Sequence, residues 1–348
     1  MEKQKPYNPA VDILRTIAIL AVILIHTTTK TIAVSHFDLN NISFAVFLNQ
    51  AARFAVPLFF MISGFVLELS YPFHTNYIAY LKKRLSRIFV PYVFWSTIYF
   101  LFIYPKHGVV NYFLALIGGT ASYQLYFIPA LLIFYLIFPL IHKYYSVFSK
   151  KGVIILLGIV QILLLYINYY VVTIPLFYPI IIAILNYYVF ILGVVFSHHT
   201  DELSIFLKRW KNLIFALTLT LAFSVFLEGK NLYLKTHNYL YIYSQWRPSV
   251  LIYTIFIAGS LYELFNRDFS NVKIIKTFSR LSFFVFFIHI IIHEFIWQNF
   301  GANLYKITNG AIFRNPFYDP LYFITVAAIS FTIAYIAHKI PYLSKLTG

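Results

Sequence analysis

The sequence predicts an all-α integral membrane protein with about ten transmembrane helices and both termini on the cytoplasmic side. Three observations lead to this prediction. Only 11% of the residues are charged and 61% are hydrophobic, whereas a soluble domain carries about 25% charged residues. Apolar stretches of about 20 residues recur along the chain, the length that crosses a hydrocarbon core about 30 Å thick. Lysine and arginine gather in alternate loops between these stretches.

Ten apolar segments account for most of the chain. Each is continuously apolar rather than alternating, which favours helices over a β-barrel. The predicted spans are residues 13–34, 51–69, 88–104, 123–141, 153–172, 177–197, 213–227, 249–262, 281–299 and 321–337. Residues 109–120 are apolar but too few to cross, so we expect a re-entrant or interfacial segment there. Residues 1–348 are expected to form a single membrane domain with no appended soluble domain.

The first span resembles a signal peptide, because Lys3 and Lys5 precede an apolar run. Arg15 and His26 interrupt that run, however, and no small-residue cleavage motif follows it. More spans come after it. We therefore expect this segment to be retained as the first transmembrane helix.

The distribution of cations orients the predicted spans. With the N-terminus in the cytoplasm, 18 of the 27 Lys and Arg residues fall on the inner side, 7 in outer loops and 2 in or beside spans. This asymmetry supports an even number of spans with both termini inside. It also explains the net charge of +16 without nucleic acid as a partner. The outer group consists of Lys30, Lys106, Lys230, Lys235, Arg247, Lys306 and Arg314.

Three polar side chains interrupt the first span. Arg15 and His26 are eleven residues apart, so on a helix they point in directions only about 20° apart. Asp12 lies one turn before Arg15, where a carboxylate and a guanidinium can pair. Ionisable groups in a membrane normally face a protein interior or a wet cavity. The alternatives are that Arg15 is an interfacial anchor and that His26 only packs against a neighbouring helix, but neither explains why the two side chains share one face.

The motif Asp-x-x-Arg-x10-His formed by Asp12, Arg15 and His26 resembles the opening motif of the acyltransferase-3 family of multi-pass membrane O-acyltransferases. Residues 57–66 (PLFFMISGFV) are similar to the second span of that family, and residues 80–92 (YLKKRLSRIFVPY) are similar to the basic loop entering its third span. Residues 126–129 and 287–289 match more loosely. The resemblance covers the whole chain in layout and is specific mainly over residues 10–95.

Members of this family move acyl groups, often acetyl from a cytoplasmic acyl-coenzyme A, onto sugars of surface glycans. The resemblance implies a multi-pass enzyme of the cell membrane with acetyl-CoA or another acyl-CoA as co-substrate. The expected acceptor is a hydroxyl of a cell-surface polysaccharide or glycolipid. Neither a metal nor nucleic acid is expected.

Acyl transfer to a hydroxyl needs a base, and an imidazole is well matched to that task near neutral pH. His26 is the candidate base, with Arg15 and Asp12 as the other catalytic candidates. The chain has no cysteine, so the open choices are direct attack, which we favour, and an acyl intermediate on Ser, Tyr or His.

Further candidates bind donor and acceptor. Lys83, Arg84 and Arg87 are expected to hold the phosphates of coenzyme A, unless they only mark an inner loop. Arg53, near the outer end of the second span, is expected to contact the acceptor or polarise the acyl carbonyl, unless it is an interfacial anchor. His289 is expected to line the same cavity. His293 lies four residues further on, but Glu294 follows rather than separates the two histidines, unlike the zinc-protease pattern.

A transporter or flippase for a lipid-linked sugar is the competing function, because intramembrane Arg, His and acidic groups also mark transport pathways. Against it, the sequence shows no inverted repeat and no paired helix breaks in matching halves. A purely structural membrane subunit would not explain the shared polar face of the first span.

Overall fold

The computed structural model describes residues 8–35, 38–71, 77–105, 108–172, 174, 177–267, 269 and 272–344. All the regular secondary structure in these ranges is helical. Among the cations that set the predicted orientation, Lys3, Lys5, Lys106 and Lys345 lie outside the described residues. The side chain of Lys83 lies outside them too, although its backbone is helical.

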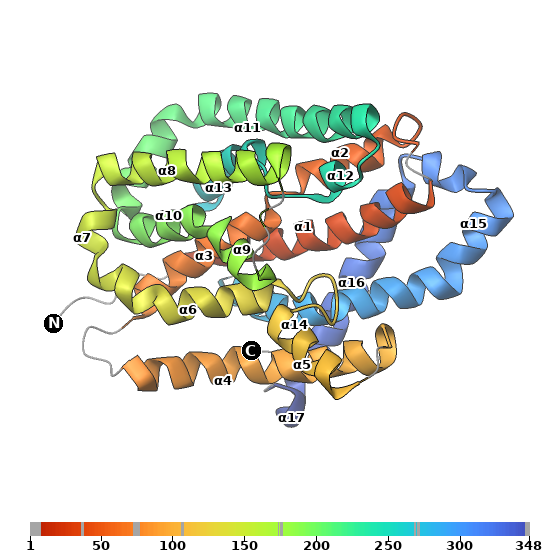
Figure 1. The fold of residues 1–348 in the computed structure, drawn as a ribbon, viewed down its shortest axis with the longest axis horizontal. Helices are drawn as coiled ribbons and strands as arrows, with labels where there is room; N and C mark the ends of the chain where they lie inside the picture. The colour runs from red at the N-terminus through yellow and green to blue at the C-terminus, as the bar shows by residue number, and fades with distance from the viewer. Residues whose placement is uncertain are drawn as a thin grey trace. The chain divides into compact units, whose positions relative to one another are not determined.

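The helices follow one another along the chain with short connections (Figure 1). They are α1 (Pro9–Val34), α2 (Ser43–Ala51), α3 (Ala55–Ser70), α4 (Tyr77–Ile98), η1 (Tyr99–Ile103), α5 (Val109–Gly118), α6 (Phe127–Lys143), α7 (Tyr145–Phe148), α8 (Lys151–Tyr166), η2 (Ile167–Val171), α9 (Tyr178–Ile184), α10 (Tyr187–His198), α11 (Thr200–Thr236), α12 (Leu240–Tyr243), α13 (Pro248–Phe265), α14 (Val272–Ile296), η3 (Trp297–Gly301), α15 (Ala302–Thr308), η4 (Ala311–Arg314), α16 (Tyr318–Lys339) and α17 (Pro341–Ser344).

Eight helical segments of the described chain are long and apolar enough to cross a membrane. They are Pro9–Val34, Ser43–Ser70, Tyr77–Ile103, Lys151–Val171, Thr200–Thr236, Leu240–Phe265, Val272–Thr308 and Tyr318–Lys339. The pair α9 and α10, bent by 49°, counts as a ninth if it forms one span.

The remaining predicted span coincides with α6, whose 17 residues are at the lower limit for crossing. Every predicted span thus falls on a helix, and the multi-pass α-helical fold is confirmed. The number ten and the orientation of the termini stay predictions. The 10 residues of α5 are too few to cross, as expected.

The chain divides into two compact units. The first unit contains Pro57–Phe206 with Met1–Asn8 and Ile340–Gly348, and the second contains Pro9–Val56 and Leu207–Lys339. The expectation of a single membrane domain is a statement about both units together and stays a prediction.

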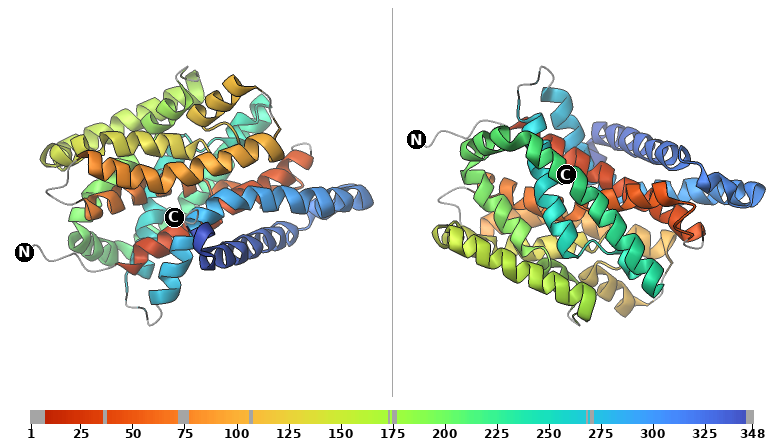
Figure 2. Two further views of the ribbon diagram at one scale, coloured as in Figure 1. Left: turned by 90° about the horizontal axis from the view of Figure 1, so that it is seen from below. Right: turned by 90° about the horizontal axis from the view of Figure 1, so that it is seen from above.

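In the second unit, α1 and α14 run side by side in the same direction. Near the start of both helices, Arg15 donates a hydrogen bond to Ser279 (2.8 Å). Near their ends, Lys30 pairs with Glu294 (3.6 Å). Both contacts join residues that are separated by the same number of positions in the chain, so the two helices must be parallel and in register. The helix α16 packs against both (Figure 2), so α1 is enclosed by protein along much of its length.

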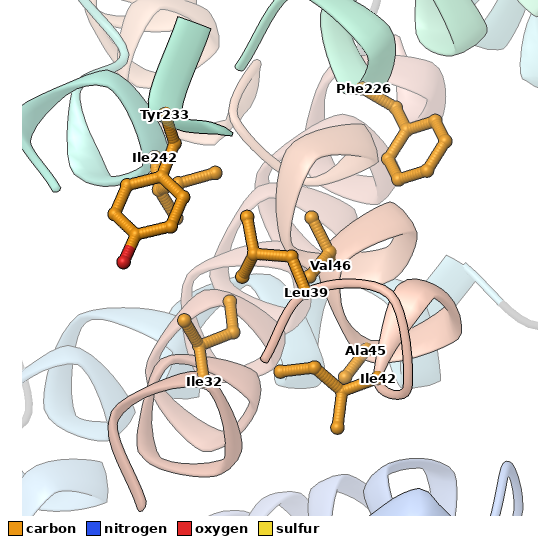
Figure 3. Packing of buried hydrophobic residues seen from close by; sticks show 8 residues of the cluster. All are labelled: Ile32, Leu39, Ile42, Ala45, Val46, Phe226, Tyr233 and Ile242. Carbon is orange, nitrogen blue, oxygen red and sulfur yellow. The ribbon is translucent and has the colours of Figure 1, made fainter. Parts of the chain in front are cut away.

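A hydrophobic cluster closes the end of the second unit where α1 leads into α2 (Figure 3). Its buried members are Ile32, Leu39, Ile42, Ala45, Val46, Phe226, Tyr233 and Ile242. They come from α1, the connection after it, α2, α11 and α12. The cluster fixes the position of α2 relative to α1, and α2 carries the polar residues that reach the candidate site.

In the first unit, α3 and α10 approach each other closely through two glycines. A Cβ atom on Gly193 would overlap the carbonyl oxygen of Met61, and one on Gly64 would overlap the carbonyl oxygen of Phe190. Small residues at a helix interface allow such backbone contact in membranes. Nearby, the rings of Phe134 and Phe190 stack with centroids 4.3 Å apart, which packs α6 against α10.

A buried carboxylate ties together one end of the first unit. Oε1 of Glu68 accepts hydrogen bonds from Nδ1 of His142 (2.9 Å) and from Nε2 of His198 (2.7 Å). These three residues come from α3, α6 and α10. Two imidazole donors on one carboxylate oxygen explain how a carboxylate is tolerated at a buried position.

Candidate active site

The candidate site is a polar seam between α1 and α14 in the second unit. At its first level, Arg15 contacts Asp12 on its own helix, with Nη1 3.1 Å from Oδ1. The hydroxyl of Ser279 on α14 donates to the same Asp12 oxygen (2.6 Å) and accepts from Arg15. The expected pairing of Asp12 and Arg15 is therefore present, and a serine that the sequence did not single out holds the pair against α14.

The second level of the seam brings two histidines together. The ring of His26 on α1 lies 5.4 Å from the ring of His289 on α14, centroid to centroid. His289 is fully buried, whereas His26 keeps partial exposure. Arg15 and His26 both contact α14, as their spacing predicted, so they share one face of α1. Of the two histidines, His26 is the less buried.

The hydrogen bonding of His289 fixes its tautomer. Its Nδ1 lies 2.9 Å from the carbonyl oxygen of Val285, one turn earlier on α14. A carbonyl only accepts, so Nδ1 carries the proton and Nε2 presents a lone pair. Among the described residues, this buried Nε2 has no hydrogen-bond partner. The site therefore contains an unused acceptor beside the His26 ring, which suits a bound group that brings its own O–H donor.

Arg53 is connected to α1 through one asparagine. Its guanidinium donates to the side-chain oxygen of Asn49 and to the carbonyl of Tyr243 (2.6 Å for the latter). Asn49 in turn donates from its amide to the carbonyl of Ile25 (3.0 Å) and to Thr28 (2.9 Å). Arg53 is thus held by the helical turn that carries His26. The side chain is 3% exposed, which does not fit an interfacial anchor.

A second arginine joins this network. Arg247 is fully buried. Its guanidinium donates to the side-chain oxygen of Gln50, and Nη1 lies 3.4 Å from Oε2 of Glu228. The sequence placed Arg247 among the cations of an outer loop. Its backbone does precede α13, but the side chain points into the protein because Gln50 and Glu228 supply acceptors there. Gly229 makes room for it, since a Cβ atom would come within 2.9 Å of the guanidinium.

Beyond the two histidines, α1 bonds to both α14 and α16. Thr31 donates to the carboxylate of Asp319 (2.7 Å). Lys30, besides its pairing with Glu294, lies 4.8 Å from the ring centre of Trp297. The predicted neighbour of His289, His293, is engaged elsewhere, because its Nδ1 lies 2.8 Å from the hydroxyl of Tyr322. The i, i+4 histidines therefore have different partners.

The candidate donor-binding cations lie on α4 in the first unit. Arg87 is exposed and Arg84 is half-buried. The guanidinium of Arg84 donates to the hydroxyl of Ser70 and lies 5.9 Å from the ring centre of Tyr80. With Arg84 and Arg87 three residues apart, their side chains occupy neighbouring positions on the helix.

A family model for the acyltransferase domain matches residues 8–339, which includes nearly all of both units. This chain belongs to the acyltransferase-3 family. The family resemblance of the sequence is therefore confirmed.

This chain is also similar to a Bacillus subtilis (strain 168) protein described as "putative membrane-bound acyltransferase YfiQ". The two are 30% identical over 148 residues. That segment covers 40% of this chain and 41% of the relative, so the similarity spans about two fifths of either protein. No solved structure matches this chain.

The structure brings Asp12, Arg15, His26, His289 and Arg53 into one unit around α1, and it places Arg84 and Arg87 in the other. Sequence reasoning missed Ser279, Asn49 and Arg247. A serine or an asparagine in an apolar helix gives little signal by itself. Only their contacts with Arg15, Ile25 and Gln50 identify them.

Proposed function

We propose that this acyltransferase moves an acyl group, acetyl being the expected one, from cytoplasmic acyl-coenzyme A to a hydroxyl of a cell-surface polysaccharide or glycolipid. The observation that carries the proposal is that the rings of His26 and His289 lie 5.4 Å apart, centroid to centroid, while Nε2 of His289 has no hydrogen-bond partner among the described residues. Two imidazoles at the same level of two neighbouring membrane helices can bind a hydroxyl group and accept its proton.

The reaction that we propose is a direct transfer. The acceptor O–H gives its proton to a nitrogen of His26 as its oxygen attacks the thioester carbonyl carbon. A C–O bond forms and the C–S bond breaks, and the sulfur leaves as the thiolate of coenzyme A, which takes up the proton from His26. An imidazole suits both proton transfers near neutral pH.

The other residues take supporting roles in this proposal. The Nε2 atom of His289 accepts a hydrogen bond from the acceptor sugar and orients it. Arg53, held by Asn49, stabilises the negative charge that develops on the carbonyl oxygen. Arg15, held by Asp12 and Ser279, supplies a fixed cation at the first level of the seam.

The donor's phosphates would bind at Lys83, Arg84 and Arg87. Arginine matches phosphate with two parallel hydrogen bonds. Arg84 is already oriented by Ser70 and Tyr80, so less side-chain freedom is lost when it binds a phosphate. We place the enzyme in the cell membrane, with the lipid bilayer as its solvent and no nucleic acid as a partner.

The decisive experiment uses purified protein in lipid nanodiscs with radiolabelled acetyl-CoA and O-deacetylated envelope glycan from a deletion strain. An enzyme of the proposed kind releases free coenzyme A thiol and labels the glycan. A transporter or flippase would do neither, so the absence of both products would contradict the proposal.

A further inference from the structure

A pocket of about 410 Å³ lies in the first unit. Tyrosines line much of it: Tyr104, Tyr123, Tyr126 and Tyr178. They come from the end of the α4–η1 helix, from the connection between α5 and α6, and from the start of α9. Figure 1 shows α9 beside the beginning of α6, where these segments meet. A volume of this size is ordinary for a small-molecule site.

The backbone between α5 and α6, which lines this pocket, is fixed by close contacts and a side-chain hydrogen bond. The helix α5 ends at Gly119, whose φ of +68° lies in the left-handed region that favours glycine. A Cβ atom on Gly119 would come within 2.5 Å of Cα of Tyr126. The turn that follows is fixed by a hydrogen bond from Ser122 to the side-chain oxygen of Gln124 (2.5 Å). The wall of the pocket is therefore preformed.

The lining is mainly apolar and consists largely of aromatic faces. The rings of Tyr126 and Tyr178 meet edge to face with centroids 5.6 Å apart, and those of Tyr104 and Tyr123 lie 6.1 Å apart. Each tyrosine offers an apolar ring and a polar tip. A pyranose ring is complementary, because its C–H bonds pack on aromatic faces while its hydroxyl groups point outward from its edge.

A buried amide fixes the turn that lines the pocket. Gln124 is 3% exposed and lies in the chain between the lining residues Tyr123 and Tyr126. Its side-chain oxygen accepts the hydrogen bond from Ser122.

The pocket and the cationic pair lie at opposite ends of one helix. Arg84 lies on α4, and Tyr104, 20 residues later, directly follows its continuation η1, a separation of about 30 Å along a helix axis. That distance is close to the thickness of the hydrocarbon core. The charge bias predicts the Arg84 end in the cytoplasm, so the pocket opens at the outer surface, where cell-surface glycans lie.

From these observations we infer that the tyrosine pocket binds a sugar unit of the glycan acceptor. The inference rests on the proposed function and deepens it, since it assigns a saccharide subsite in the first unit to an enzyme whose candidate base lies in the second. The four tyrosines hold the glycan chain without touching the reacting atoms. Their effect therefore falls on acceptor affinity rather than on the chemical step.

The test measures steady-state kinetics in nanodiscs with acetyl-CoA and O-deacetylated envelope glycan. The variants are Tyr123→Ala and Tyr178→Ala, at residues that are 45% and 38% exposed. We expect the KM for glycan to rise at least about tenfold in each, with kcat and the KM for acetyl-CoA unchanged. The control is Tyr166→Ala, at a tyrosine that is 51% exposed and lies outside the pocket, which should behave as wild type.

Two outcomes would overturn the inference. If Tyr123→Ala and Tyr178→Ala both keep the wild-type KM for glycan, these tyrosines form only an aromatic belt at the membrane interface. If wild type shows no transfer at all, the proposed function fails, and thermal unfolding then tests the pocket alone. In that case, glycan should raise the Tm of wild type and Tyr166→Ala but not of Tyr123→Ala, and equal shifts would reject a sugar site.

Discussion

The residues of the α1–α14 seam differ in their burial and in their hydrogen-bond partners. His26 is half-buried, and His289 is buried with its tautomer fixed by Val285. Asp12 and Ser279 both accept hydrogen bonds from Nη1 of Arg15. In the proposed reaction His26 exchanges protons and the other residues position the reacting groups, so the two kinds of residue should respond differently to substitution.

His26→Ala should lower glycan acylation by about 10²–10⁴-fold, because removal of a general base typically costs that much. Expression and membrane insertion should stay normal, since the ring is only partly buried. Ile25→Ala is the matched control. It changes packing beside the site but keeps the backbone carbonyl that Asn49 contacts. A wild-type rate in folded His26→Ala would mean that another group acts as the base.

Arg15→Ala should also abolish acylation, because it leaves the Asp12 carboxylate in the membrane helix without its cation. Arg15→Lys should restore only part of the rate, because a point charge replaces a planar guanidinium whose Nη1 donates to both Asp12 and Ser279. The measurement is the rate of glycan labelling per mole of folded protein. Full activity in Arg15→Lys would reduce the role of Arg15 to its charge alone.

At the scale of helices, close packing in the first unit depends on backbone contact. Gly193 of α10 lies against the carbonyl of Met61 on α3. Gly152, at the start of α8, has no heavy atom within 4 Å of where its Cβ would be. The same substitution at these two glycines therefore isolates the effect of helix approach.

Gly193→Ala should destabilise the protein by about 1–3 kcal/mol, because the added methyl group forces α3 and α10 apart. Gly152→Ala should be neutral or slightly stabilising, since alanine loses less backbone entropy than glycine in a helix. Thermal unfolding in detergent compares the two variants. Equal Tm values for Gly193→Ala and wild type would show that α3 and α10 tolerate a wider separation.

The first turns of α4 carry the candidate phosphate contacts. Changing Arg84 and Arg87 together to Gln should weaken acetyl-CoA binding at least about tenfold, because a hydrogen bond to a charged group contributes about 1.5–3 kcal/mol. Added salt should weaken binding to wild type more than to the double variant. The control is Lys208→Gln with Arg209→Gln, which removes two exposed cations from α11. If the two double variants bind acetyl-CoA equally well, Arg84 and Arg87 serve only to orient the helix in the membrane.

For the whole molecule, the parallel arrangement of α1 and α14 limits the possible topologies. Because both helices run in the same direction, they begin on the same side of the membrane. An even number of crossings must therefore separate their starting points. The predicted ten spans satisfy this condition, since eight precede the one that contains α14.

Reporter fusions after Lys83, Lys151, Lys211, Lys276 and Lys345 should all report the cytoplasm. The physical reason is that cations are retained on the inner side during insertion. The fusion after Lys276 is the most informative, because it tests the parallel pair directly. Two or more fusions reporting the outer side would reject the ten-span topology, and Lys276 alone outside would place α1 and α14 in opposite orientations.

The sequence by itself determined the membrane class, the positions of the helices and the face that Arg15 and His26 share. These properties depend on local composition and on the 3.6-residue period of one helix, both of which are present in the chain as written. It also identified His289, because an ionisable residue within an apolar run is conspicuous. The family followed from the motif on α1 and from residues 57–92.

Tertiary structure alone decided which groups meet. Ser279 contacts Arg15, His26 lies against His289, and Arg247 is buried with Gln50 rather than exposed in a loop. Residues 197 or more positions apart in the chain carry several of these contacts. Such pairings arise from how helices pack, and packing depends on side chains distributed over several helices at once. No local pattern contains that information, which is why the tyrosine pocket and the second buried arginine emerged only from the fold.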